Sequence, residues 1–332
     1  MQAHLIALDW GTTSLRAYKL GRSGQVLDQR ALASGIMQLP TTPRTIAGQP
    51  CGNGFELAFD EACGDWLAAE PHVPVIACGM VGSAQGWREA AYCPTPARVA
   101  DLGASLQTVE TLRGTVLHIV PGVIQHSRLP NVMRGEETQV LGLLCDLPAD
   151  TRQDSLLIGL PGSHSKWVSL EEGCIQQFDT FMTGEVYAAL CAHTILGRTQ
   201  QPSAGFDEAA FIRGVQVALS PDGTLGLLSN LFSARTLGLT GQLAGTEQAD
   251  YLSGLMIGHE LHALARACRE RRGEGGLPQV VLIGSVALCQ RYQIALRLCG
   301  FAQVGLAEQA TERGLWSLAV AAGLLAPLPE EV

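Results

Sequence analysis

Two stretches of the chain repeat one pattern of apolar and polar positions: an apolar run, a turn rich in hydroxyl groups, and two further short apolar runs. The runs of the first copy are Leu5–Asp9, Ser14–Leu20 and Gln25–Ala33, and those of the second are Ser155–Leu160, Trp167–Leu170 and Cys174–Phe181. Short apolar runs separated by Gly and Ser are typical of β-strands joined by tight turns. The repeat predicts two similar domains, each opening with a three-stranded meander.

Between and after these copies, apolar residues recur mainly at helical spacing. We expect helices over residues 55–69, 186–196, 207–219, 225–237, 246–272, 286–299 and 310–325. Continuous apolar runs predict buried strands at 73–78, 115–120 and 279–283, whereas the polar stretch 103–112 predicts a helix or a loop. Strands that alternate with helices indicate an α/β fold. We expect one domain over residues 1–120 and a second over 121–332.

Composition narrows the class of protein. The 332 residues are 47% hydrophobic and 16% charged, which is enough apolar material for two folded domains. The net charge of −9 and the lack of an extended basic run disfavour nucleic acid as a partner. The chain begins directly in a strand and has no apolar run of membrane-spanning length, so we expect no membrane association. The ten cysteines show no Cys-x-x-Cys spacing, which favours buried thiols in a reducing cytoplasm.

The first turn carries one carboxylate, one glycine and three hydroxyls. Gly11 permits a close backbone approach or a positive φ, and the amides and hydroxyls of Thr12 and Thr13 can donate to phosphate oxygens. Asp9, at the end of the strand, can hold a hydrated Mg²⁺ that bridges those phosphates. The pattern predicts a phosphate loop; the alternative is an ordinary turn that follows an aspartate.

The second turn, Pro161–Lys166, repeats this chemistry without the aspartate. Its phosphate-binding candidates are Gly162, Ser163, His164 and Lys166. Because the two turns occupy equivalent places in two similar domains, we expect them to hold one chain of phosphates between them. Such a pair of turns is a more specific signal than either turn alone.

Two further turns follow apolar strands, where ligands collect in open α/β sheets. The first is a glycine-rich turn whose candidates for substrate contact are Gly79, Met80, Ser83 and Trp87; the alternative is a purely structural turn. The second is Gly284-Ser285, where glycine leaves room for a nucleoside and Ser285 is positioned to cap the following helix. We expect adenosine to bind there.

The order of these motifs resembles that of the actin-like ATPase superfamily, which includes the sugar kinases. Within it the chain is similar to the 2-dehydro-3-deoxygalactonokinase family. The strings that carry the resemblance are Ala7–Ala17, Gly79–Ser83, Asn131–Gln139, Pro161–Trp167 and Met182–Glu185. The resemblance implies two ribonuclease-H-like domains with an ATP and substrate cleft between them. It also implies use of ATP and Mg²⁺ to phosphorylate 2-dehydro-3-deoxy-D-galactonate on its 6-hydroxyl, a step of galactonate degradation.

The resemblance also indicates a general base. Many related sugar kinases place an aspartate after a glycine at a helix start, and here the matching string is Gly135-Glu136-Glu137. Glu136 is therefore expected to take the proton of the acceptor hydroxyl. Glu137 as the base, and Glu136 as a mere partner of the helix dipole, remain alternatives. Arg16 and Arg134 are the candidates for holding the substrate carboxylate, each with a surface or structural ion pair as its alternative.

Two other functions stay open at this point. One is a kinase that acts on another sugar or sugar acid. The other is an actin-like nucleotide switch without kinase activity, which is disfavoured by the carboxylate before the second loop and by the lack of a further partner-binding domain. The expected partners are small molecules, and a homo-oligomer is left open.

Overall fold

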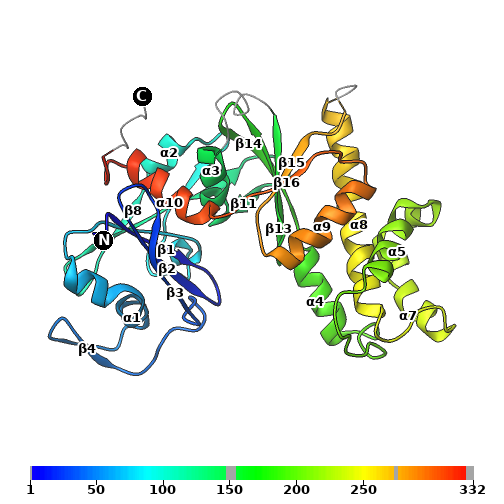
Figure 1. Ribbon diagram of the computed structural model, residues 1–332, viewed down its shortest axis with the longest axis horizontal. Helices are drawn as coiled ribbons and strands as arrows, with labels where there is room; N and C mark the ends of the chain where they lie inside the picture. The colour runs from blue at the N-terminus through cyan, green and yellow to red at the C-terminus, as the bar shows by residue number, and fades with distance from the viewer. Residues whose placement is uncertain (1, 147–154, 273–275, 327–332) are drawn as a thin grey trace. The chain divides into compact units, whose positions relative to one another are not determined.

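The computed structural model describes residues 2–146, 155–272 and 276–326, which form two compact units (Figure 1). Of the described residues, the first unit contains 2–146, 170–177 and 308–326, and the second contains 155–169, 178–272 and 276–307. The predicted boundary after residue 120 therefore lies inside the first unit. The chain returns to the first unit at its end because helix α10 (Ala310–Ala321) packs on α3 (Glu136–Asp146).

A six-stranded sheet organises the first unit. Its order is β3 (Val26–Leu32), β2 (Leu15–Leu20), β1 (Leu5–Trp10), β6 (Val75–Cys78), β9 (Val116–Ile119) and β8 (Gln107–Glu110). The meander β1–β3 is antiparallel, as expected of strands joined by short turns, and β6 and β9 extend the sheet in parallel. The prediction of a helix or loop over 103–112 is wrong for β8. Val109 of this polar edge strand is buried, and pairing with β9 decides its conformation.

Helix α1 (Gly54–Ala69) covers the apolar core of this sheet. It begins after Asn53, whose side chain accepts a hydrogen bond from the Phe55 amide, and it buries Phe59 among residues of the central strands. The remaining elements of the unit are short. They are α2 (Val99–Gly103), the 3₁₀ turn η1 (Met80–Gly82), the hairpin β4 (Arg44–Ile46) and β5 (Gln49–Cys51), and a small sheet of β7 (Tyr92–Pro94), β10 (Gly122–Gln125) and β11 (Asn131–Met133).

A five-stranded sheet of similar strand order runs through the second unit, although residues 170–177, in one of its hairpins, belong to the first unit. Its order is β14 (Cys174–Phe181), β13 (Ser165–Glu171), β12 (Leu156–Leu160), β15 (Gln279–Leu282) and β16 (Val304–Leu306). The first three strands in sequence again lie in the order third, second, first, followed by parallel strands that arrive after helices. The repeated order confirms the predicted duplication and the mixed α/β class.

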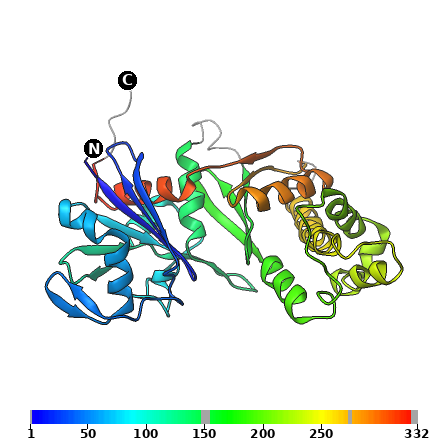
Figure 2. The ribbon, with the colours of Figure 1, turned by 60° about the horizontal axis from the view of Figure 1, so that its bottom comes forward.

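Helices make up the rest of the second unit. Its longer ones are α4 (Thr183–His193), α5 (Glu208–Leu219), α8 (Gln248–Arg272) and α9 (Val286–Leu298). Figures 1 and 2 both show α8 beside α5, and Gly214 and Gly254 lie at this contact, where a Cβ would overlap the facing backbone. The single helix expected over 225–237 is instead η3 (Pro221–Leu225), α6 (Leu227–Asn230) and α7 (Ser233–Leu239). Gly226, at φ +83°, interrupts it.

No helix in the three described ranges is both long and apolar enough to cross a membrane.

Candidate functional site

The first phosphate loop is a tight turn between β1 and β2. The Gly11 amide donates to the Ser14 carbonyl over 2.9 Å, and Gly11 does not adopt a positive φ. A segment after β3 braces the turn, because the amides of Ile36 and Met37 each donate to a loop carbonyl over 3.1 Å. Gly35 presses against it so closely that a Cβ would overlap the backbone of the loop. These contacts hold the backbone of the turn in place, and with it the amides and hydroxyls that could bind phosphate.

Asp9 lies beside the loop at the end of β1. The antiparallel register places it opposite Arg16, and their Oδ2 and Nη1 atoms are 3.3 Å apart. The Asp9 side chain is only 20% exposed. Burial raises the pKa of this carboxyl, and the nearby Arg16 guanidinium opposes the rise. Asp9 therefore has a charge partner and a small opening to solvent.

Three segments that are distant in sequence meet at this loop. Gly79 follows β6 at φ +91°, and a Cβ there would lie 2.8 Å from the Trp10 carbonyl oxygen. Gly135 precedes α3 at φ +108°, and its Cβ would lie 3.3 Å from the Gly79 Cα. Glycine is needed at both positions because each combines left-handed backbone with a close approach. The ends of β1 and β6 and the start of α3 are thereby brought to one place.

The two adjacent glutamates at the start of α3 have different surroundings. Glu137 is fully buried; its Oε2 accepts from the Gly135 amide at 2.7 Å and its Oε1 from the Thr138 hydroxyl at 3.0 Å. Burial, helped by the charge of Glu136, raises the Glu137 pKa to about 7. Glu136 is half-buried, and its Oε2 accepts from the Arg134 amide at 3.0 Å. Glu136 is therefore the more accessible carboxylate of the pair.

Arg134 packs beneath the turn that follows β6. Its Nη2 donates to the Ala90 carbonyl at 2.7 Å, and its guanidinium lies 4.4 Å from the centre of the Tyr92 ring. Its Nε and Nη1 atoms and the Ser83 hydroxyl are buried and have no hydrogen-bond partner among the described residues. Buried polar groups are seldom left without a partner, so these three donors are suited to an anion or a hydroxyl supplied from outside.

The other residues predicted for the substrate pack differently. Trp87 stacks on Phe55 at 5.8 Å between ring centres and meets Trp10 edge-on at 6.0 Å. Met80 is half-buried against the same core. Arg16 is 55% exposed and tied to Asp9, whereas Arg134 is half-buried and its Nε and Nη1 atoms are buried. The aromatic cluster and Met80 therefore pack the turn against the core of the first unit.

The second phosphate loop is held by the start of α4. Gly184 contacts the loop so closely that a Cβ would overlap the Gly162 carbonyl oxygen, and the Glu185 amide donates to the Ser163 carbonyl at 3.0 Å. The side chains of His164 and Glu185 are hydrogen-bonded across this contact. Lys166 is buried, and its ammonium donates to the Thr180 hydroxyl of β14 at 2.9 Å. The ammonium is thus tied to β14.

A cavity of about 310 Å³ opens beside this loop within the second unit. Its walls come from the loop, from the start of α4, and from α8 and α9: Gly162, Ser163, Thr183, Gly184, Tyr187, Ser253, Met256, Ile257, Leu288, Arg291 and Tyr292. The sequence did not indicate the α8 and α9 residues, because nothing in their spacing differs from ordinary helix packing.

Gly284 borders the same loop, since a Cβ on it would lie 3.5 Å from the Pro161 carbonyl oxygen. Ser285 is exposed at the N-cap position of α9, but its side chain makes no capping hydrogen bond. The expected side-chain cap is therefore wrong.

Comparison with known proteins decides the family. The family model described as 2-keto-3-deoxy-galactonokinase matches residues 9–318. This chain belongs to that family. A galactonokinase-family protein from Rhizobium meliloti (strain 1021), named "Probable 2-dehydro-3-deoxygalactonokinase DgoK1", is 34% identical over 93% of this chain and 94% of its own length. The 2-dehydro-3-deoxygalactonokinase of Escherichia coli (strain K12) is 32% identical over 96% and 98%.

A crystal structure from the same family confirms the fold. It is that of a candidate 2-dehydro-3-deoxygalactonokinase from Sinorhizobium meliloti, 34% identical, which superimposes with a TM-score of 0.79 over 98% of this chain and 100% of the other. The family therefore spans both units and all the motifs described above.

Proposed function

We propose that this chain is an ATP-dependent kinase that phosphorylates 2-dehydro-3-deoxy-D-galactonate on its 6-hydroxyl. The observation that carries the proposal is the meeting, in the first unit of a galactonokinase-family chain, of a phosphate loop, an accessible carboxylate at Glu136 and buried, unpartnered donors of Arg134. Phosphoryl transfer depends mainly on positioning and charge stabilisation, and these groups supply both.

Glu136 is the proposed general base. It is half-buried, and the Arg134 amide orients its carboxylate, whereas both oxygens of Glu137 are engaged by neighbouring donors. The base accepts the proton of the 6-hydroxyl as its oxygen attacks the γ-phosphorus of ATP, and ADP leaves. General-base assistance of this kind typically contributes ~10²–10⁴-fold to the rate.

Asp9 is the proposed ligand of Mg²⁺, through water. Magnesium commonly takes one or two carboxylates and keeps several waters, so a single aspartate with a small opening to solvent fits it. When bound, the metal neutralises charge on the phosphates. Gly11, Thr12 and Thr13 contact the same phosphates with amides and hydroxyls. Gly162, Ser163, His164 and Lys166 form the proposed phosphate contacts of the second loop.

Arg134 is proposed to bind the substrate carboxylate. Its unpartnered Nε and Nη1 atoms leave donors available for a carboxylate, and the Ser83 hydroxyl is a further unpartnered donor. Arg16 has its own carboxylate partner in Asp9, which makes it the weaker of the two candidates. Gly79, Met80 and Trp87 complete the proposed substrate turn. Met80 and Trp87 contribute by packing the turn against the hydrophobic core.

The nucleoside is proposed to bind in the second unit, between the second phosphate loop and helices α8 and α9. The cavity there is bordered by Gly162 and Leu288, and Gly284 adjoins the same loop. Ser285 is the remaining proposed adenosine contact.

We also infer a reducing cytoplasmic setting, because all ten cysteines are free thiols.

A coupled assay of ADP release tests the proposal. With ATP and Mg²⁺ present, turnover should require 2-dehydro-3-deoxy-D-galactonate and should be highest with it across a panel of 2-keto-3-deoxy acids. Preference for another acid would change the assigned substrate but would still identify the protein as a kinase. ATP hydrolysis that is unaffected by any sugar acid would instead identify a nucleotide switch.

A further inference from the structure

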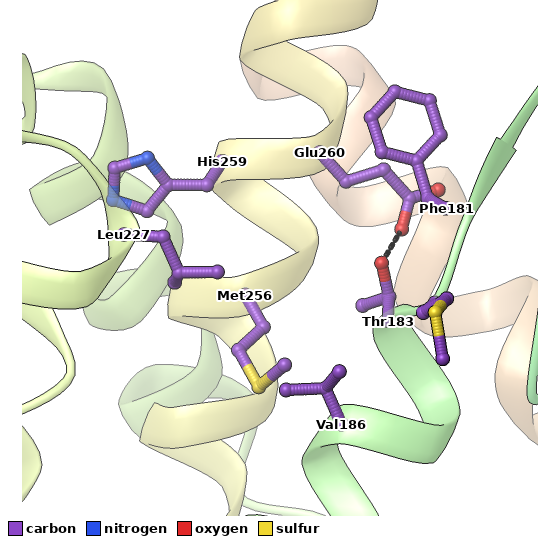
Figure 3. Close-up of a pocket in the computed structure, with 8 residues that line it drawn as sticks. Phe181, Thr183, Val186, Leu227, Met256, His259 and Glu260 are labelled. Atoms are coloured by element: carbon purple, nitrogen blue, oxygen red, sulfur yellow. Dashed lines mark hydrogen bonds between the residues drawn. The ribbon is translucent and has the colours of Figure 1, made fainter. Parts of the chain in front are cut away.

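A buried carboxyl group connects the parts of the second unit that surround its phosphate loop. Glu260 lies on α8 and is 4% exposed. Its Oε1 accepts from the Trp167 indole at 2.7 Å, and its Oε2 accepts from the Thr183 hydroxyl and from the Tyr292 hydroxyl, the latter at 2.9 Å. Figure 3 shows Thr183 at the start of α4 pointing at Glu260. One side chain thus joins β13, α4 and α9 to α8.

Tyr292 and Thr183 each connect Glu260 to the loop. Ser165 closes the turn, and its hydroxyl is 2.9 Å from that of Tyr292. Thr183 begins the helix whose next two residues, Gly184 and Glu185, press on and hydrogen-bond the loop backbone. A shift of the Glu260 carboxylate would therefore reach the loop by two routes. Met182–Glu185 is one of the strings that carry the resemblance to the family. Within it, Thr183 contacts Glu260, and Gly184 and Glu185 contact the loop.

We propose that Glu260 is a positioning residue for nucleotide binding, which holds the second phosphate loop in its binding geometry through Thr183 and Tyr292. This deepens the proposed function and rests on it for the identity of the nucleotide. Glu260 does not touch the loop itself, so its effect is expected on ATP affinity and not on the acceptor.

The ionised form of Glu260 is the one that fits the three donors. A carboxylate accepts all three bonds, whereas a protonated carboxyl brings a hydrogen that one hydroxyl must turn to accept. Burial raises the Glu260 pKa to about 7, against the effect of the three hydrogen bonds. The group also lines a hollow of about 350 Å³ (Figure 3), which gives water a route to it.

The groups that face Glu260 are few. β13 presents Trp167, α4 presents Thr183 and α9 presents Tyr292, whose own pKa burial raises far above neutrality. Helix α5 meets α8 through apolar side chains such as Phe211 and Val215. On α8 itself, His259 bonds to Asn230 at 2.8 Å and points away from Glu260 in Figure 3. Of the groups named here, Glu260 is the one whose pKa is raised to about 7.

The test measures binding of a non-hydrolysable ATP analogue by calorimetry, without sugar acid. At pH 8, Glu260→Gln should weaken binding about tenfold, as expected for loss of a charge-assisted hydrogen bond. At pH 6, where wild-type Glu260 is largely protonated, the two proteins should agree within about twofold. Glu270→Gln on the exposed face of α8 is the matched control and should follow the wild type at both pH values. Equal affinities of both variants at both pH values would overturn the proposal.

Thr183→Val provides a second route if Glu260→Gln does not fold. It should weaken binding at pH 8 to a similar extent, and the double variant should bind no more weakly than either single variant. Wild-type affinity of Thr183→Val would contradict the role of Glu260.

Hydrogen exchange of the loop amides at 162–165 in ligand-free protein separates this inference from the proposed function. Faster exchange in Glu260→Gln than in Glu270→Gln supports it even if no ATP analogue binds, and equal exchange argues against it.

Discussion

The two units repeat one strand order but hold their phosphate loops by different means. In the first unit the brace is local: Gly35 and the two residues after it follow β3 directly and bond to the loop backbone. In the second unit the brace is a helix start, and its anchor is Glu260, which lies 77 residues further along the chain than Thr183. Asp9 precedes the first loop and has Arg16 as its partner, whereas the carboxylate at the second loop is Glu185, which is bound to His164.

This contrast indicates a division of work. The first loop, with Asp9 before it, lies in the unit that also carries Glu136, and that unit is suited to accept a proton and to support a metal. The second loop, whose neighbouring carboxylate Glu185 is bound to His164, is suited to hold phosphates and a nucleoside. Substitutions in the first unit should therefore lower kcat, and those in the second should raise the KM for ATP.

Glu136→Gln should have the largest effect. An amide keeps the size and hydrogen bonding of the side chain but cannot take a proton, so kcat should fall by ~10²-fold or more while ATP affinity stays within about twofold. Glu137→Gln is the matched control and should retain kcat within about threefold. Loss of turnover in Glu137→Gln with an active Glu136→Gln would assign the base to Glu137. Full activity in both variants would show that neither glutamate at the start of α3 is the general base.

The second effect is on stability and comes from the buried Glu137. Its pKa is raised to about 7 from an ordinary 4.5, so the folded protein binds a proton that the unfolded chain has lost. The stabilisation this provides is fully present below pH 4.5 and is lost as pH rises through 7. The unfolding free energy of Glu137→Gln relative to wild type should increase between pH 5 and pH 8, by up to roughly 3 kcal/mol. Denaturant titrations at the two pH values measure it; a pH-independent difference would argue against a raised pKa.

The smallest effect separates the two braces. Gly35→Ala and Gly184→Ala each place a methyl group against a loop backbone, an overpacking that costs typically 1–3 kcal/mol. Steady-state kinetics should show Gly35→Ala lowering kcat about tenfold and Gly184→Ala raising the KM for ATP about tenfold, since about 1.4 kcal/mol corresponds to a factor of ten. Gly205→Ala, which has open space around its Cβ, is the control. If both glycine variants change the same constant, the two loops do not differ in role.

Local patterns predicted much of this structure. Both meanders, α1 and α8 follow from strand-like runs and helical spacing within single segments. The order of the turns also located most of the candidate residues, because ligand groups follow strand ends.

What the sequence did not predict depends on contacts between distant segments. The approach of Gly135 to Gly79 and the convergence of three donors on Glu260 join elements that no periodicity connects. The strand β8 needed its partner β9, and the return of α10 to the first unit needed the surface of α3. Tertiary packing decides such features, so one sequence read locally does not reveal them.

The proposed reaction transfers the γ-phosphoryl group of ATP to the terminal hydroxyl of a sugar acid. The most direct measurement is ³¹P NMR of the products formed from ATP, Mg²⁺ and 2-dehydro-3-deoxy-D-galactonate. We expect a phosphate monoester whose signal is split by the two protons of the C6 methylene, formed in equal amount to ADP. A signal of inorganic phosphate alone, or of phosphate on a carbon that bears one proton, would contradict it.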